Sequence, residues 1–341
     1  MDDIQGLAGY AAGPCLRDKA AMRSSRLQEG SLSGMGCRDC PRNCNIDREF
    51  DVGFCGEGNN IRIARAALHM WEEPCISGAE GSGAVFFTGC NLRCVFCQNH
   101  NISTGRVGDE ISIDRLVQIF FELEYQGANN INLVTATHFA RPVAKAIAMA
   151  KDQGFSLPFI YNCGGYESVE TLKRLDGLVD IYLPDFKYLD EKHAASYSKA
   201  VDYPKVAKLA LDEMYRQVKR PVFDERGIMQ KGMIVRHLLL PECLLDARHI
   251  VKYLYETFGD NIYISLMNQY TPLPHLDEER FPNLTHKVRR ASYEKLVDYA
   301  ISLGVTHAFI QEGETAKESF IPEFSLEGVH QSVQIGSNHL C

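Results

Sequence analysis

The feature that most limits the fold of this chain is an alternation, from Gly83 onward, of short apolar runs with amphipathic segments. Runs that are almost continuously apolar are typical of parallel strands buried on both faces. The segments between them fit helices, and one begins at the candidate N-cap Ser112 and ends at Gly127. The seven runs cover residues 84–88, 131–135, 157–162, 179–183, 233–240, 262–266 and 306–310. We therefore predict an α/β fold with a parallel sheet, forming a barrel or part of one, with its chemistry at the carboxyl ends of the strands.

The 341 residues exceed the length that a single core usually holds. We expect residues 1–75 to form a small N-terminal appendage, with a helix near 15–28 followed by a cysteine-rich metal-binding region. Residues 76–341 are expected to form the core with a C-terminal extension. Hydrophobic residues at 45% and charged residues at 23% are typical of globular proteins. The net charge of -8 offers no field for a polyanion, which argues against nucleic acid as a partner.

The first residues, MDDIQGLAGYAAG, carry acids where a signal peptide carries positive charge. The sequence holds no apolar stretch near the roughly 18 residues of a membrane span. We therefore predict a cytoplasmic protein with no membrane contact. In that reducing compartment the 12 cysteines, most of which fall into two groups, indicate metal ligands rather than disulfides.

One cysteine group, Cys90, Cys94 and Cys97, follows the first apolar run with C-x3-C-x2-C spacing. A [4Fe–4S] cluster normally takes four cysteines, so a loop with three leaves one iron with an open position for a small molecule. Such an open iron indicates chemistry rather than electron storage. A structural zinc site is the alternative for the bare spacing.

The string SGAVFFTGCNLRCVFCQNHN resembles the signature of radical S-adenosylmethionine (SAM) enzymes. The resemblance implies a partial (β/α)6 barrel and SAM bound at the open iron. One electron from the cluster then cleaves SAM and yields a 5′-deoxyadenosyl radical. It also implies that Phe96, before the third cysteine, lies against the SAM adenine.

The wider string EEPCISGAEGSGAVFFTGCNLRCVFCQN is similar to the branch related to pyruvate formate-lyase activating enzyme. This resemblance implies an activating-enzyme-like oxidoreductase or lyase, a reduced flavodoxin or ferredoxin-type electron donor, and a glycyl-radical enzyme as protein substrate. Radical modification of a small molecule, peptide or RNA is a second hypothesis. A non-catalytic iron–sulfur electron carrier is a third, against which the open iron argues.

Polar residues follow several of the predicted strands. Thr135, Thr137 and His138 stand where the family carries a Gly-Gly-Glu stretch that binds the SAM amino group, so the resemblance implies a SAM contact there despite the different residues. His138 is alternatively a cap of the next helix. Asn162, in YNCGGY, lies where the related enzymes approach the SAM methionine moiety.

Asp185 and Lys187 match an Asp-x-Lys element of the activating enzymes, and two residues apart on a strand end they point to the same side. An ordinary surface ion pair is the alternative. Of the neighbours Arg236 and His237 only one can enter the barrel, and we predict that Arg236 does so and contacts SAM.

The second cysteine group, Cys37, Cys40, Cys44 and Cys55, has C-x2-C-x3-C-x10-C spacing in the N-terminal region. Four thiols in a segment too short for a core of its own indicate a bound metal. A tetrahedral zinc ion and an auxiliary [4Fe–4S] cluster both use four cysteines, and the spacing leaves the two open.

Overall fold

The computed structural model describes residues 36–311 and 321–330. These described residues belong to one compact unit. The helix expected near residues 15–28 lies outside them.

A ten-stranded sheet organises the described residues, in the order β10-β9-β8-β6-β5-β4-β2-β1-β3 with β7 paired to β8. Seven neighbouring strands are parallel and follow one another in chain order. They are β2 (Ser82–Phe87), β4 (Ile131–Val134), β5 (Phe159–Cys163), β6 (Ile181–Pro184), β8 (Met229–Leu238), β9 (Tyr263–Met267) and β10 (Ala308–Ile310). Each coincides with one of the seven apolar runs, so the predicted α/β fold with a parallel sheet is confirmed.

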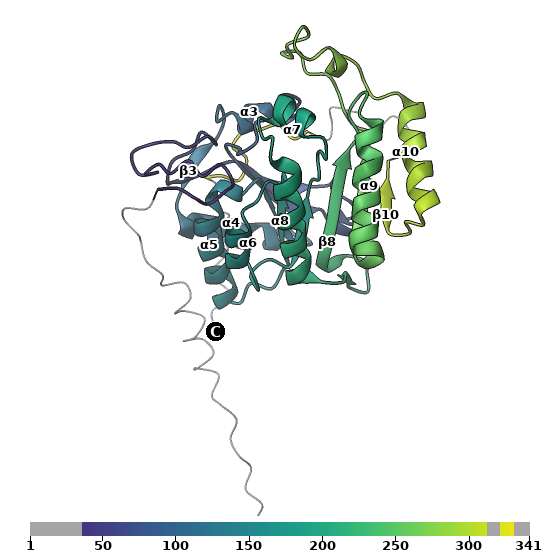
Figure 1. Ribbon diagram of the computed structural model, residues 1–341. Helices are drawn as coiled ribbons and strands as arrows, with labels where there is room; N and C mark the ends of the chain where they lie inside the picture. The colour runs from purple at the N-terminus through teal and green to yellow at the C-terminus, as the bar shows by residue number, and fades with distance from the viewer. Residues whose placement is uncertain (1–35, 312–320, 331–341) are drawn as a thin grey trace, which may run out of the picture. The chain divides into compact units, whose positions relative to one another are not determined.

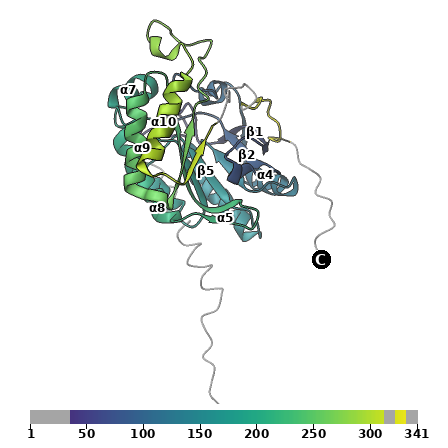
Figure 2. The same ribbon diagram turned by 90° about the vertical axis from the view of Figure 1, so that its right-hand side faces the viewer.

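Six helical connections link the parallel strands and cover one face of the sheet (Figures 1 and 2). Their main helices are α4 (Ile113–Tyr125), α5 (Ala140–Asp152), α6 (Val169–Arg174), α8 (Tyr203–Val218), α9 (Leu244–Phe258) and α10 (Arg290–Leu303). In α4, the Ser112 hydroxyl accepts a hydrogen bond from the Arg115 backbone N–H at 3.0 Å, as its predicted N-cap role requires. Among the described residues β10 is not paired with β2, so the barrel is a partial one.

Short elements complete the connections. They are α2 (Pro74–Ser77), α3 (His100–Ser103), α7 (Glu191–Ser198) and the 3-10 turns Thr137–Phe139, Gly259–Asn261 and Pro282–Leu284. Of these, α2 packs on the face of the sheet that the long helices leave free, where Cys75 and Ile76 contact Ile160, Leu183 and Ile234. Residues of alternate orientation, such as Tyr161, face the helices instead.

Three antiparallel strands were not predicted. They are β1 (Ile61–His69), β3 (Asp109–Ile111) and β7 (Val222–Phe223). Because β1 pairs with β2 along its length, the expected boundary near residue 75 does not coincide with a break in the sheet.

The described C-terminal segment 321–330 returns to β1. The Ala66 N–H donates to the Glu327 carbonyl at 2.8 Å, and the Leu326 N–H donates to the Ala64 carbonyl at 3.1 Å. Ahead of them, the Phe324 ring meets the β2 residue Phe86 edge to face, with centroids 5.4 Å apart. Within the described residues no helix is both long and apolar enough to cross a membrane.

Candidate functional site

The loop that carries Cys90, Cys94 and Cys97 leaves the carboxyl end of β2. His138 Nε2 lies 2.6 Å from the Thr88 carbonyl oxygen, which fixes the start of the loop from one side. From the other side Gly89, at φ +85, packs so closely that a Cβ there would lie 2.9 Å from the Cys55 carbonyl oxygen. Glycine is therefore required at this position both by conformation and by space.

The three thiols of the loop interact with one another and with a cation. Burial, followed by the neighbouring thiolates of Cys94 and Cys90, raises the pKa of Cys97 to about 12, while the nearby Lys187 ammonium acts in the opposite direction. The Ser198 hydroxyl donates a hydrogen bond to Cys94 Sγ at 2.9 Å. Three crowded thiols ionise together only if positive charge compensates them, as a bound metal would.

The triad fits an iron–sulfur cluster. Within residues 36–311 and 321–330, no three His, Cys, Asp or Glu side chains gather closely enough to hold one metal ion. A four-iron cluster binds each thiolate at a different iron, so its cysteines lie further apart than the ligands of one ion. Three thiols beside the Lys187 ammonium suit a [4Fe–4S] cluster, and a single zinc ion stays the alternative.

Phe96 lies between two of these cysteines and is 6% exposed. Its ring meets Tyr188, Tyr197 and Tyr270 edge to face, each at a centroid distance of 6.4 Å. The structure thus places Phe96 in an aromatic cluster next to the cysteine loop, and its contact with adenine stays a prediction.

Four of the predicted residues meet in one polar network at the carboxyl ends of β5, β6 and β8. Asp185 binds Lys187 Nζ at 2.6 Å and Arg236 Nε at 3.0 Å. Arg236 Nη2 donates to Asn162 Oδ1 at 2.6 Å. His237 points the other way, with Nδ1 against the Phe186 carbonyl, so Arg236 is the residue that enters the interior.

Electrostatics keep this network charged. Burial alone would raise the pKa of Asp185, but the Lys187 and Arg236 cations outweigh it and the pKa is lowered. Burial likewise opposes the charge of Lys187, yet Asp185 raises its pKa above the usual range. The side chains of Asp185 and Lys187 are 20% and 18% exposed, so the pair does not fit an ordinary surface ion pair.

The acidic residue that completes the network was not predicted from the sequence. Glu72 lies between β1 and α2, and its Oε2 is 3.2 Å from Arg236 Nη1. Asn132 Nδ2 donates to the other Glu72 oxygen at 2.9 Å. The two consecutive acids of the string EEPC were the only signal, and nothing in the sequence indicated that this segment reaches the inner face of the sheet.

Two buried acceptors beside the network have no hydrogen-bond donor among the described residues. They are Asn132 Oδ1 and Glu73 Oε2. Buried acceptors are normally satisfied, so each is a candidate contact for a donor group of a ligand. A SAM ammonium is a donor of this kind.

The residues after β4 make contacts within the protein, and their predicted contact with SAM stays a prediction. The Thr137 hydroxyl donates to Glu167 Oε1 at 2.8 Å, and both residues are fully buried. Burial lowers the pKa of His138 to about 3, so its ring is neutral, and it makes no side-chain cap to α5. Only Thr135, at φ +61, touches the network, because its backbone N–H donates to the Asn162 carbonyl at 2.8 Å.

Glu167 is a second acidic residue that was not predicted from the sequence. Its burial raises its pKa to about 8. Tyr161 OH lies 3.3 Å from Glu167 Oε2, which adds to the bond from Thr137. This acid belongs to the layer between the strand ends and the helices and not to the network around Arg236.

The second cysteine group lies next to the triad loop. Cys40 and Cys55 are buried, whereas Cys37 and Cys44 are half-buried. Cys44 Sγ accepts a hydrogen bond from the Phe54 backbone N–H at 3.3 Å. A Cβ on Gly53 would lie 3.4 Å from Cys55 Sγ and 3.5 Å from Cys44 Sγ, so these two sulfurs flank the same glycine.

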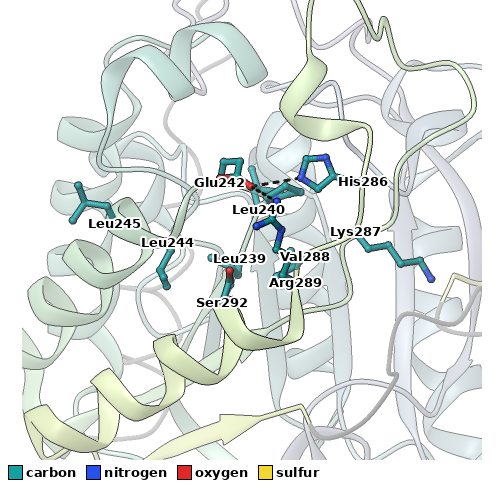
Figure 3. A pocket seen from close by; sticks show the side chains of 11 residues that line it. Leu239, Leu240, Glu242, Leu244, Leu245, His286, Lys287, Val288, Arg289 and Ser292 are labelled. Atoms are coloured by element: carbon teal, nitrogen blue, oxygen red, sulfur yellow. Dashed lines mark ion pairs between the residues drawn. The ribbon is translucent and has the colours of Figure 1, made fainter.

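A surface pocket lies between the N-terminal ends of α9 and α10 (Figure 3). Glu242 faces His286 at 3.7 Å and Arg289 at 4.0 Å across it. No residue predicted for the site lines it. We therefore place the candidate site at the cysteine loop and the Arg236 network and not in this pocket.

Residues 84–220 match the family model of the radical SAM superfamily. The match begins in β2 and ends just beyond α8, so it contains the cysteine triad together with Asn162, Asp185 and Lys187. This segment is therefore similar to the superfamily predicted from the sequence, for which a [4Fe–4S] cluster and SAM are the implied cofactors and a reductant is needed.

A curated relative extends the likeness beyond this segment. An uncharacterized protein of Methanocaldococcus jannaschii is 25% identical over 281 residues, which cover 77% of this chain and 74% of the relative. Its name assigns no activity.

Solved structures with a similar arrangement are more distant. Streptococcus suis SuiB bound to S-adenosylmethionine is 13% identical, with a TM-score of 0.43 over 66% of this chain and 48% of SuiB. HydG, a maturase of the [FeFe]-hydrogenase, is 16% identical, with a TM-score of 0.46 over 66% of this chain and 50% of HydG. The matched region thus spans about half the length of either protein.

Proposed function

We propose that this radical SAM chain resembles a glycyl-radical enzyme activase and installs a radical on a glycine of a protein substrate. When bound at Cys90, Cys94 and Cys97, a [4Fe–4S] cluster supplies one electron that cleaves SAM to methionine and a 5′-deoxyadenosyl radical, which then takes hydrogen from the substrate. The observation that carries the proposal is the convergence of the triad loop and the charged Arg236 network at one edge of the sheet.

Different residues of the network suit different groups of SAM. Arg236 and Lys187 offer cationic donors that suit the SAM carboxylate. The free acceptors Asn132 Oδ1 and Glu73 Oε2 suit its ammonium group. Asp185, held ionised between its two cations, accepts hydrogen bonds and so suits a ribose hydroxyl.

The Cys97-Gln98-Asn99 string and the Asp185-x-Lys187 element support the activase branch. In the structure Gln98 Nε2 donates to the Gln269 carbonyl at 2.9 Å, which ties the end of the cysteine loop to the segment after β9. This contact draws the loop toward the strand ends, where a substrate glycine would have to reach the radical. Tight positioning of this kind is what radical transfer needs.

Two measurements test the proposal. Anaerobically reconstituted protein is reduced with dithionite, and 5′-deoxyadenosine and methionine are measured by chromatography beside a Cys94→Ala variant. We expect cleavage by the wild type alone. Absence of cleavage from a loaded and reducible cluster, with and without candidate substrates, would contradict radical SAM activity.

The substrate class is tested with a glycyl-radical enzyme from the same organism. After incubation with SAM and reductant, the activase proposal predicts a glycyl radical in the electron paramagnetic resonance (EPR) spectrum of that enzyme. SAM cleavage without this signal, but with a modified small molecule, peptide or RNA, would retain radical SAM chemistry and overturn the activase assignment.

A further inference from the structure

The N-terminal cysteine group, defined by Cys37, Cys40, Cys44 and Cys55, lies on a segment with no helix or strand between residues 36 and 60. Its turns are closed by few bonds, such as Cys37 N–H to the Ile46 carbonyl at 2.7 Å and Asn45 N–H to the Cys37 carbonyl at 2.9 Å. A segment of this kind has no core of its own, so a bound metal is the natural source of its stability.

This segment is fastened directly to the triad loop. The Cys90 backbone N–H donates to the Cys55 carbonyl at 3.2 Å. This hydrogen bond connects Cys55, a member of the N-terminal cysteine group, to Cys90 of the triad through the two main chains. The close packing of Gly89 on the Cys55 carbonyl makes the same contact from the side.

Arg42 provides a second set of contacts between this segment and the surroundings of the triad. Its guanidinium donates to the Asn91 carbonyl at 2.7 Å, to the Ser198 carbonyl at 3.0 Å and to the Lys199 carbonyl. Asn91 follows Cys90, and Ser198 is the residue that donates to Cys94 Sγ. The Arg42 cation also stacks on the Phe54 ring at 3.9 Å. Through Arg42 the segment thus contacts the residue after Cys90 and the residue that hydrogen-bonds to Cys94.

The cysteine group has an inner and an outer side. Cys40 and Cys55 are 8% and 7% exposed, whereas Cys37 and Cys44 are more accessible. Between Cys44 and Cys55 the segment also presents two exposed apolar side chains, Phe50 at 81% and Val52 at 64%. Such a surface suits the transient docking of a small partner protein.

We propose that Cys37, Cys40, Cys44 and Cys55 hold an iron–sulfur centre through which an electron passes from a docked carrier protein to the triad. The inference rests on the proposed function for its acceptor, the cluster at Cys90, Cys94 and Cys97. A reduced one-electron carrier gives one electron to the oxidised centre, and the centre passes the same electron to the triad cluster. No bond is made or broken, and the centre returns to its oxidised state.

The observations favour this role over a structural zinc. Zinc is redox-inert and would gain nothing from a main-chain connection to the triad.

The metal is tested with two variants and the wild type, each reconstituted anaerobically and analysed for iron, sulfide and zinc. A Cys90→Ser/Cys94→Ser/Cys97→Ser variant is expected to keep about half of the wild-type iron and a reducible EPR signal of its own. Zinc in place of that iron, or no metal, would overturn the proposal. Retained iron in this variant, with no SAM cleavage by the wild type, would reject the proposed function alone.

The electron path is tested with Phe50→Glu, which changes an exposed side chain, and with Ile301→Glu on α10 as the matched control, since Ile301 is 65% exposed. Reduction of the triad cluster is followed by freeze-quench EPR. With reduced flavodoxin or ferredoxin as donor, the triad cluster of the Phe50→Glu variant should be reduced about tenfold more slowly, the loss expected when a charge replaces an interface anchor. With dithionite as donor, the reduction rate of this variant should match that of the control.

A Cys37→Ser/Cys40→Ser variant extends this test to the centre itself. We expect the carrier protein to reduce its triad cluster poorly, while dithionite still does so. Unchanged reduction by the carrier protein in both Phe50→Glu and this variant would show that the electron enters elsewhere.

Discussion

Removal of the Arg236 guanidinium should cost the protein far more stability than removal of a surface arginine. In an Arg236→Met variant Asp185 keeps Lys187 at 2.6 Å, so the penalty falls on Glu72, whose carboxylate is paired with Arg236 at 3.2 Å. The two side chains are 16% and 9% exposed. Breaking a buried pair from one side costs about 3–5 kcal/mol, and we expect the lower end because Glu72 can bind a proton. Burial already raises the pKa of Glu72, so the loss should grow as the pH rises from acid to neutral.

The double variant Arg236→Met/Glu72→Gln provides the decisive comparison. The glutamine amide at position 72 can still accept a hydrogen bond from Asn132 Nδ2, and it carries no charge. The double variant should therefore lose about 1–3 kcal/mol less free energy of unfolding than the sum of the two single losses. Urea midpoints by circular dichroism, at matched iron content, give these values. Arg290→Met is the control, since its pair with Glu294 is exposed and worth at most about 1 kcal/mol. Additive single effects, or an Arg236→Met loss as small as the control, would refute the reasoning.

Two further changes probe the surroundings of the site. At pH values between its ordinary pKa and about 8, Glu167 holds a proton in the folded state that it loses on unfolding. The free energy of unfolding should therefore fall with rising pH by up to about 1.4 kcal/mol per pH unit. Glu167→Gln should flatten this slope in urea unfolding between pH 5 and 8, and an unchanged slope would assign it to other groups. Gly89→Ala places a Cβ 2.4 Å from Glu57 Cγ and should lower both the melting temperature and the triad iron content. Gly127→Ala, at a similar φ but with nothing within 4 Å, should cost only about 1–2 kcal/mol and leave the iron unchanged, and equal iron content in the two variants would contradict the proposed constraint.

The seven parallel strands were predictable because burial on both faces leaves nearly continuous apolar runs. The antiparallel strands lack that signal. In β1 the sequence IRIARAALH mixes arginines into the apolar positions, and β3 and β7 have only three and two residues. Their assignment depends on pairing partners and not on local pattern.

The site divides in a similar way. The positions of Asn162, Asp185 and Arg236 were predictable because these residues stand at or just beyond the ends of buried parallel strands, which meet at one edge. Their contacts with SAM stay predictions. Glu72 reaches the same network only because β1 turns back along β2 and delivers α2 to the inner face, which is a tertiary event. Conversely, Thr137 also follows a strand, but an acid distant in sequence, Glu167, engages its hydroxyl.

The return of residues 326 and 327 to β1 bears on the order in which the chain folds. From β2 to β10 each parallel strand is added beside the previous one, so the sheet can grow as the polypeptide leaves the ribosome, with mostly local closures. The contacts of Leu326 and Glu327 with Ala64 and Ala66 instead span most of the chain and form only after the last strand has been synthesised. Until then the backbone of β1 lacks these partners, and a nascent chain stalled before residue 326 should expose that edge to chaperones or to a second copy.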